Sequence, residues 1–286
     1  MIEQALYEHL KAQPALAEHL TTYGNALAVF NQEAPADTDP LWGAGPQYGR
    51  VIFEEDLRGD PERTMGGTLV VDIMCHKDSQ FPEEIEPIIR ELIDGYFFSN
   101  GTFTVSAQWK TSQYFTEPKD HVTGCTVAFE LLAFPVLTTV SPDVIARLNE
   151  WSATRENLFV INHTPLPHNA WKPSGSEVAV YWRKMNEKPA GWIKDTYATI
   201  WRTASVRGHI FAEDEATTET IGRQLVTALY ASKRLMKDGE VPIMVNRNNT
   251  LNSGADALRE GQITVEATYG IIVYEPPKST IDHINY

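Results

Sequence analysis

The chain has 286 residues, a length that corresponds to about two domains of roughly 150 residues each. It carries 24 basic and 38 acidic side chains. The resulting net charge of −14 argues against a protein that wraps DNA through its phosphates, because such binding requires clustered Lys and Arg. No apolar run approaches the roughly 18 residues that a membrane span requires. The opening residues lack a signal-peptide pattern and two cysteines cannot form a disulfide framework, so we expect a protein made in a reducing cytoplasm.

An internal repeat divides the chain into two halves, weak in identity and clearer in the order of its segments. Residues 26–31 (ALAVFN) correspond to residues 157–162 (NLFVIN), and each segment then enters a loop with a tryptophan, Trp42 or Trp171. Two strand-like runs follow in each half: residues 48–54 and 68–76, then 177–183 and 197–212. A repeat of this length indicates two whole domains rather than a solenoid of short units.

In each half a predicted helix follows, because apolar residues recur at helical spacing over residues 85–93 and 221–235. Pro87 is expected in the first turn of its helix, since a proline further along would break it. Thr217 or Thr218 is the expected N-cap of the second helix. The expected ends of the two helices are Asn100-Gly101 and Asp238-Gly239, which suit a left-handed cap or a tight turn.

Two further strands close each half, and a helix opens it. The predicted strands are residues 102–109 with 125–134, and 241–246 with 263–274. The first opening helix covers residues 2–10. The second is expected to start with Ser141 as N-cap and Pro142 at the first helical position.

These patterns predict an α+β fold with two related domains, each a mainly antiparallel sheet with helices packed on one face. The first domain is expected over residues 1–136. The second, a diverged repeat of the first, is expected over residues 141–286 and includes a C-terminal tail.

No pattern in the sequence indicates a catalytic, cofactor-binding or metal-binding site, so we expect neither an enzyme nor a bound cofactor. Cys75 and Cys125 are interpreted as buried thiols. Cys75, His76 and His121 could be considered as a metal site, but the sequence has neither a CxxC motif nor a pair of histidines at helical spacing. There is no Gly-x-Ser-x-Gly motif, and the Gly-Ala-Gly of residues 43–45 precedes a proline rather than a helix.

An acidic cluster lies between two of the predicted strands. As a solvated hairpin it needs no function, but such a loop is equally suited to pair with a neighbouring subunit through complementary charge. We call residues 54–63 the acidic arm. Its candidate subunit contacts are Glu54, Glu55, Asp56, Arg58, Asp60, Glu62 and Arg63.

The C-terminal tail begins at Glu275-Pro276-Pro277, and its prolines cannot continue a central strand. It is interpreted as either a frayed end or a segment that reaches a neighbour. In the second case Ile281 and Tyr286 are the candidate contacts.

Three segments of the first half resemble the tail-terminator, or tail-completion, proteins of long-tailed bacteriophages. Residues 2–10 (IEQALYEHL), with 14–17 (PALA), are similar to the first helix of the family and the short segment that follows it. Residues 48–64, with Gly59-Asp60-Pro61, resemble its extended β-arm. Residues 68–73, 85–93 and 125–134 resemble its strand–helix–strand core. The likeness covers roughly residues 1–135, and the duplication is a departure from the single-domain pattern expected of the family.

This resemblance implies a structural virion protein without chemistry of its own. Such proteins cap the tail tube at its final length and offer a surface for joining the head through the neck. The implied partners are further copies of the chain in a ring, the tail-tube protein and neck or connector proteins. DNA would pass through the ring without specific binding, and the acidic balance of the chain agrees with a channel that repels phosphate. The implied location is the tail–neck region of a virion assembled in the host cytoplasm.

Two ring stoichiometries are compatible with the repeat. Six copies would place one domain at the channel and the other outside, whereas three copies would form a pseudo-sixfold ring. The acidic arm corresponds to residues 184–194, which are neutral to basic, and this divergence favours six copies over three.

Other functions remain open from the sequence. The chain is also compatible with another neck connector, a tail-tube or sheath subunit, or a soluble assembly chaperone. A more distant alternative is a two-domain α+β ligand-binding protein or enzyme with a site near the Trp42 and Trp171 loops.

Overall fold

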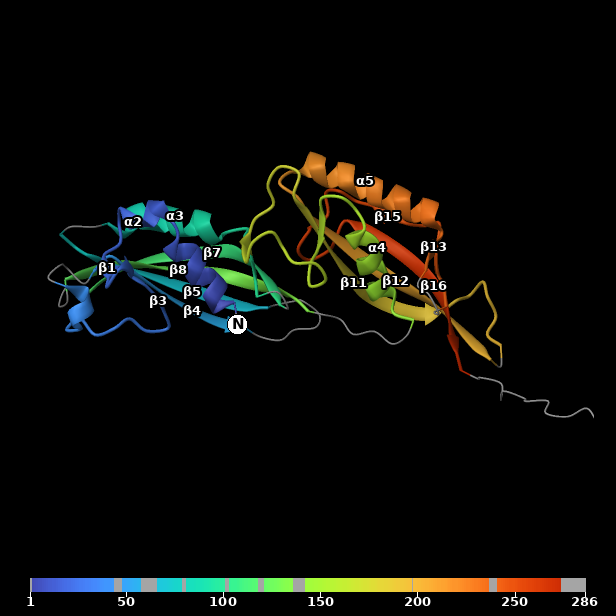
Figure 1. The fold of residues 1–286 in the computed structure, drawn as a ribbon, viewed down its shortest axis with the longest axis horizontal. Coiled ribbons are helices and arrows are strands. Elements are labelled where there is room, and N and C mark those ends of the chain that lie inside the picture. Colours follow the sequence, from blue (N-terminus) through green and yellow to red (C-terminus); the bar gives the residue numbers. More distant parts are fainter. Residues whose placement is uncertain are drawn as a thin grey trace, which may run out of the picture. The chain divides into compact units, whose positions relative to one another are not determined.

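The computed structural model describes residues 2–43, 48–57, 66–78, 81–100, 103–117, 121–135, 142–196, 198–236 and 241–273. It confirms a mixed α+β fold built around two sheets that are mainly antiparallel (Figure 1). Residue contacts divide the chain into two units. Unit 1 comprises residues 1–136 and 159–174, and unit 2 comprises residues 137–158 and 175–286.

Unit 1 contains a seven-stranded sheet with the order β10-β6-β7-β8-β5-β4-β3. All neighbours in it pair antiparallel except β3 and β4, which are parallel. Its helices are α1 (Glu3–Lys11), α2 (Pro14–Ala17), α3 (Pro82–Ile93) and the 3-10 helix η1 (Pro40–Trp42). Its strands are β1 (Thr22–Tyr23), β2 (Ala26–Leu27), β3 (Val29–Asn31), β4 (Arg50–Leu57), β5 (Gly67–His76), β6 (Phe97–Ser99), β7 (Thr104–Glu117), β8 (Val122–Phe134) and β10 (Ala170–Trp171).

Alternate residues of the long strands form the core of unit 1. Val51 and Phe53 of β4 are fully buried in one cluster with Leu6 of α1 and Ile89 of α3. The intervening β4 residues are partly or fully exposed. This alternation follows from the two-residue period of a strand.

The strand β10 comes from the second half of the sequence and completes the edge of the first sheet. Trp171 is opposite Phe97 in the register, and their rings lie 5.4 Å apart. Trp171 is only 2% exposed, and the Lys172 ammonium donates to the carbonyl of Asp94 at 2.9 Å. The loop that contains Trp171 is therefore part of unit 1, which the repeat in the sequence does not predict.

Unit 2 contains a second sheet with the order β13-β14-β16-β12-β11-β9, and β15 also pairs with β16. Its helices are α4 (Val144–Ala153) and α5 (Glu215–Ser232). Its strands are β9 (Leu158–Val160), β11 (Val178–Pro189), β12 (Thr199–Phe211), β13 (Arg234–Leu235), β14 (Ile243–Val245), β15 (Thr250–Leu251) and β16 (Ile263–Ile272). Strand β9 belongs to this sheet by its pairing, although the division by residue contacts assigns residues 159 and 160 to unit 1.

The two sheets share one strand order once β10 is set aside. In unit 1 the order is β6-β7-β8-β5-β4-β3, and in unit 2 it is β13-β14-β16-β12-β11-β9. In both, the strand before the long helix (β5 or β12) pairs with the last long strand (β8 or β16). The topology matches the repeated order of segments in the sequence.

Several predicted helix boundaries are wrong. Helix α4 begins at Val144 with Asp143 as its N-cap, so Pro142 is not at the first helical position; Ser141 lies outside the described residues. Helix α5 is capped by Asp214, whose carboxylate accepts from the backbone N–H of Thr217 at 2.7 Å. A carboxylate there also interacts favourably with the helix dipole.

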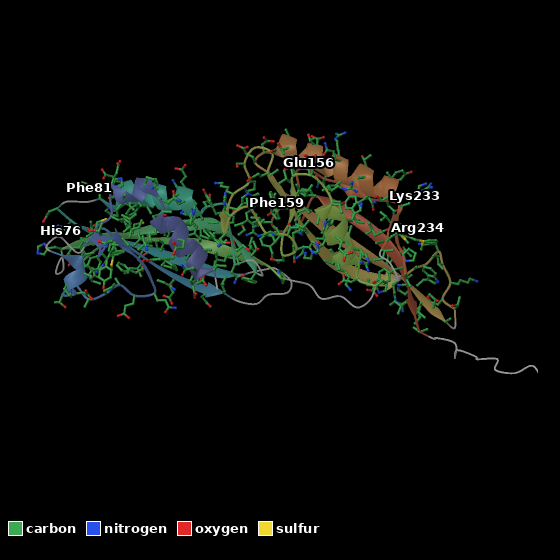
Figure 2. All side chains as sticks on the ribbon, in the orientation of Figure 1. His76, Phe81, Glu156, Phe159, Lys233 and Arg234 are labelled. Carbon is green, nitrogen blue, oxygen red and sulfur yellow. The ribbon has the colours of Figure 1, made fainter. Side chains whose placement is uncertain are left out.

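The long helices also end earlier than predicted. Helix α3 ends at Ile93, and β6 separates it from Asn100; helix α5 ends at Ser232, before Asp238-Gly239, which lie outside the described residues. Pro87 is not in the first turn, because α3 begins at Pro82 after its N-cap Phe81 (Figure 2). Since a proline has no N–H, the helix lacks one internal hydrogen bond at Pro87.

No helix in the described part of the chain combines the length and the apolar character that would carry it across a bilayer.

We expect Gly208→Ala to destabilise unit 2, because a methyl group at this β12 position would meet the buried ring of Trp182. That ring is also fixed by its indole N–H, which donates to the Ser152 hydroxyl at 2.8 Å. Overpacking of this kind costs about 1–3 kcal/mol in the free energy of unfolding, measured by chemical denaturation. Gly254→Ala is the matched control, since its nearest neighbours would lie at 3.9 and 4.0 Å. Equal stability of the two variants would contradict the described packing.

Candidate functional site

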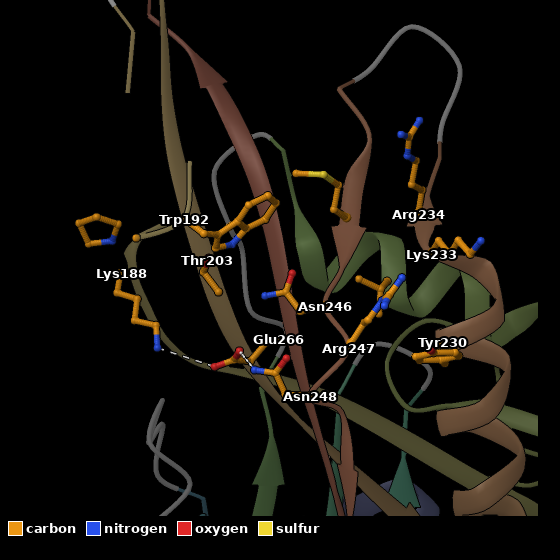
Figure 3. Close-up of a pocket in the computed structure, with 14 residues that line it drawn as sticks. Lys188, Trp192, Thr203, Tyr230, Lys233, Arg234, Asn246, Arg247, Asn248 and Glu266 are labelled. Carbon is orange, nitrogen blue, oxygen red and sulfur yellow. Dashed lines mark hydrogen bonds and ion pairs between the residues drawn. The ribbon is translucent and has the colours of Figure 1, made fainter. Parts of the chain in front are cut away.

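A broad groove of about 840 Å³ in unit 2 collects positive side chains in an otherwise acidic protein (Figure 3). We call it the cationic groove. Its charged and aromatic lining residues are Lys188, Trp192, Tyr230, Lys233, Arg234, Arg247 and Glu266. The charged side chains that line the groove are therefore four cations and a single carboxylate.

The end of α5 positions two of these cations, Lys233 and Arg234, at the groove. Lys233 follows the helix with a φ of 56°, a left-handed conformation that stops the helix, and its N–H donates to the carbonyl of Leu229. The chain then turns into β13, so that Lys233 and Arg234 lie at the C-terminal end of α5 (Figure 2). The backbone N–H of Val245 donates to the carbonyl of Lys233 at 2.9 Å, which ties this turn to β14.

The other wall of the cationic groove is formed by the far end of the β11–β12 hairpin. Lys188 lies near the end of β11, and Trp192 follows in the connecting loop. The Tyr269 hydroxyl of β16 donates to the Glu187 carboxylate at 2.6 Å, and the Lys184 ammonium lies 3.3 Å from the same oxygen. Burial acts to raise the pKa of Glu187, but these two partners lower it below its usual range.

Polar contacts fix the floor of the cationic groove. Glu266 accepts from the Asn248 amide at 2.7 Å and lies 3.7 Å from the Lys188 ammonium. The hydroxyls of Thr203 and Thr268 are 2.9 Å apart, and Thr268 also donates to the Asn246 side chain at 3.1 Å. The carboxylate of the groove is therefore held in place by Lys188 of β11 and by Asn248 of the loop between β14 and β15.

The side chains that face solvent in the cationic groove are suited to binding. Trp192 is 63% exposed and Tyr230 is 52% exposed. Within the described residues, Lys233, Arg234 and Arg247 make no ion pair. Exposed cations beside aromatic rings attract anionic groups and stack on planar ones. The arrangement thus favours a partner with an excess of carboxylates or phosphates.

The acidic arm is described only up to residue 57. Glu54 and Asp56 are exposed on one side of β4, whereas Glu55 lies on the other side with Val51 and Phe53. Four further predicted contact residues of the arm, and both of the tail, lie outside the described residues: Arg58, Asp60, Glu62, Arg63, Ile281 and Tyr286. Their proposed subunit contacts stay predictions.

Glu55 is an unusual carboxyl group, because the core side of β4 removes it from water. Both of its carboxylate oxygens are buried, and among the described residues neither oxygen has a hydrogen-bond partner within the usual limits of distance and angle. Burial raises the pKa of Glu55 to about 7, the Glu3 carboxylate raises it further, and the backbone of Ile2 partly opposes the rise. A charged Glu55 is therefore costly to the fold.

The two cysteines are free and buried, as expected. Burial is the main cause that raises the pKa of Cys75 to about 12 and that of Cys125 to about 11, so both thiols stay protonated near neutrality. The rings of His76 and His121 stack 6.2 Å apart. In the described part of the chain, no three His, Cys, Asp or Glu side chains are grouped to hold a metal ion.

Comparison with models of protein families, with curated proteins and with solved structures found no match.

We expect Glu55→Gln to remove a pH dependence of stability. The folded-state pKa of about 7 lies above the ordinary 4.5, so the protein keeps a proton that the unfolded chain releases. The stability linked to Glu55 is complete below about pH 4.5 and is lost as the pH rises through about 7. Relative to the wild type, Glu55→Gln should gain about 1–2 kcal/mol in the free energy of unfolding between about pH 5 and 8.

The exposed neighbour provides the control for this experiment. Glu54→Gln removes the same charge from an exposed position on the same strand and is the matched control. If chemical denaturation gave the same slope for the wild type and Glu55→Gln, Glu55 would not be buried as described.

Proposed function

We propose that this protein is a structural subunit of the virion of a long-tailed bacteriophage, a tail terminator. Six copies form a ring that caps the tail tube at its final length and offers a surface to the neck. The observation that carries the proposal is the unequal division of charge between two units of the same strand order. Unit 1 has 21 acidic and 9 basic side chains, whereas unit 2 has 17 and 15.

This division of charge supports assembly by a head-to-tail contact. A ring requires two different surfaces on each copy that bind one another around a rotation axis. An acidic unit and a unit with a cationic groove provide surfaces of opposite sign. Complementary charge of this kind favours a defined orientation of the partners.

The shared strand order supports the interpretation of the chain as a duplicated domain. In unit 1 the buried cluster unites alternate strand residues with α1 and α3. We infer that the helices cover one face of each sheet and leave the other face to neighbours. The sheets then serve as the rigid frame that presents hairpins and edges to other subunits.

Unit 1 is the candidate to line the channel of the ring. The excess of carboxylates in unit 1 would repel the phosphates of DNA, so that DNA passes without specific binding. The remaining partners of the proposal are the tail-tube protein on one side of the ring and neck or connector proteins on the other. The ring belongs to the tail–neck region and is assembled in the host cytoplasm.

We expect the purified protein to form a discrete species of about six times its 32.1 kDa chain mass, measured by light scattering after size exclusion. An assembly of three chains would instead support the pseudo-sixfold ring. A monomer at all concentrations would contradict the proposal.

The biological role is tested by a stop codon at Trp42 in the phage that encodes the chain. Electron microscopy should show overlong or ragged tails beside free heads, and a plasmid copy of the wild-type gene should restore normal particles. Tails of normal length that fail to join heads would move the protein to the neck. Complete infectious particles without it would overturn a structural role.

A further inference from the structure

We propose that the cationic groove of one copy binds the acidic arm of a second copy of this chain. This contact is the one that the proposed ring would use. Only the closure of such contacts into a ring rests on the proposed function. The contact itself rests on the charges and the geometry of the groove and of β4.

The cationic groove has more positive than negative side chains. Of its four cations, Lys188 faces Glu266 at 3.7 Å. Lys233, Arg234 and Arg247 are exposed and have no ion pair within the described residues. Three cations held together repel one another, and a carboxylate-rich partner would relieve this repulsion.

The acidic arm carries the complementary charge. Its ten residues include five acidic and two basic side chains. In the described portion, Glu54 and Asp56 are exposed two residues apart on one side of β4. Side chains at this spacing point the same way along a strand, so both carboxylates can face one binding surface.

The base of the acidic arm is held rigidly by the sheet of unit 1. The register between β4 and β5 continues to Leu57 opposite Gly67. Gly67 has a φ of 146°, and a Cβ there would collide with the carbonyl of Asp56. The N–H of Gly66 also donates to the carbonyl of Leu131 at 2.8 Å. Such a base lowers the entropy lost when the arm binds.

The mixed charge of the cationic groove favours a protein segment over a nucleic acid. Glu266 lies within the groove and would repel a phosphate backbone, whereas it can accept a hydrogen bond from an arginine. The acidic arm offers Arg58 and Arg63 among its carboxylates. The net charge of −14 also acts against the approach of a polyanion.

A charge-exchange experiment tests the contact. The groove-reversed variant carries Lys233→Glu and Arg234→Glu, and the arm-reversed variant carries Glu54→Lys and Asp56→Lys. All four side chains are exposed, so the folded units should be preserved, and circular dichroism checks this. Each variant alone should associate at least 100-fold more weakly than the wild type in sedimentation velocity.

An equal mixture of the two variants should recover assembly. In the mixture, the reversed arm of one variant meets the reversed groove of the other, and the two unchanged surfaces also pair. The control variant, Arg155→Glu with Arg223→Glu, reverses two exposed cations of unit 2 outside the groove and should assemble like the wild type.

Each remaining outcome contradicts a distinct statement. Wild-type assembly by either reversed variant alone would overturn the groove–arm contact and leave the ring intact. Failure of the mixture to recover would show that the arm and the groove do not meet between copies. Binding of a labelled 20-nucleotide DNA strand that is lost only in the groove-reversed variant, with assembly unchanged, would assign the groove to nucleic acid. Suppose that each reversed variant loses assembly and the mixture recovers it, but phage that lacks the protein has normal tails. This result would overturn the tail-terminator role and leave the groove–arm contact in place.

Discussion

The pairing of β5 with β8, and of β12 with β16, is the constraint on which each unit depends. After β5 the chain passes through α3, forms β6 beside the edge strand β10, and returns through β7 before β8 pairs with β5. Unit 2 repeats this route from β12 through α5 to β16. These pairs close long loops, so the helix and the edge strands acquire fixed positions only when the central pair forms. The same closure brings the end of α5 and the end of β11 to opposite walls of one groove.

The two units share this strand order but differ in charge and, within the described residues, in which strand pairs are long. In unit 1 the long pair is β7 with β8, and in unit 2 the β11–β12 pair continues to Pro189 opposite Arg202. The extended hairpin of unit 2 carries Lys188 and Trp192 to the groove, at the place where unit 1 has the acidic arm. Equivalent positions of one fold have thus acquired opposite charge, which is the property that a directional contact between copies requires.

The sequence predicted the long elements well, because their hydrophobic periods are strong. The predicted strand 68–76 lies within β5, and the predicted strand 263–274 contains β16. The predicted helix boundaries are wrong where more than one residue could cap the helix, because Asp143 and Asp214 are the N-caps. The prediction for α3 is wrong because this helix contains Pro87 in its interior. Strand β10 has two residues and pairs across a long stretch of sequence, so no local pattern marks it.

The candidate site was only partly accessible from the sequence. The neutral-to-basic character of residues 184–194 was visible, but their nearness to Lys233 and Arg247 depends on the strand order of the sheet. Glu55 had a usable signal, since strand alternation from Val51 and Phe53 already places it on the core side. The acidic residues of the arm are not equivalent, because β4 buries the Glu55 carboxylate and exposes Glu54 and Asp56.

The most direct test of the central claim is a zero-length cross-link between the two charged surfaces. A carbodiimide activates a carboxylate, and the neutral amine of a lysine in contact with it then forms an amide while the carbodiimide leaves as a urea. A mixture of ordinary and ¹⁵N-labelled wild-type protein identifies links between copies by mass. We expect mixed-isotope links from Lys188 or Lys233 to Glu54 or Asp56. Links from these lysines exclusively to other carboxylates, or links from them to the arm that are never of mixed isotope, would contradict it.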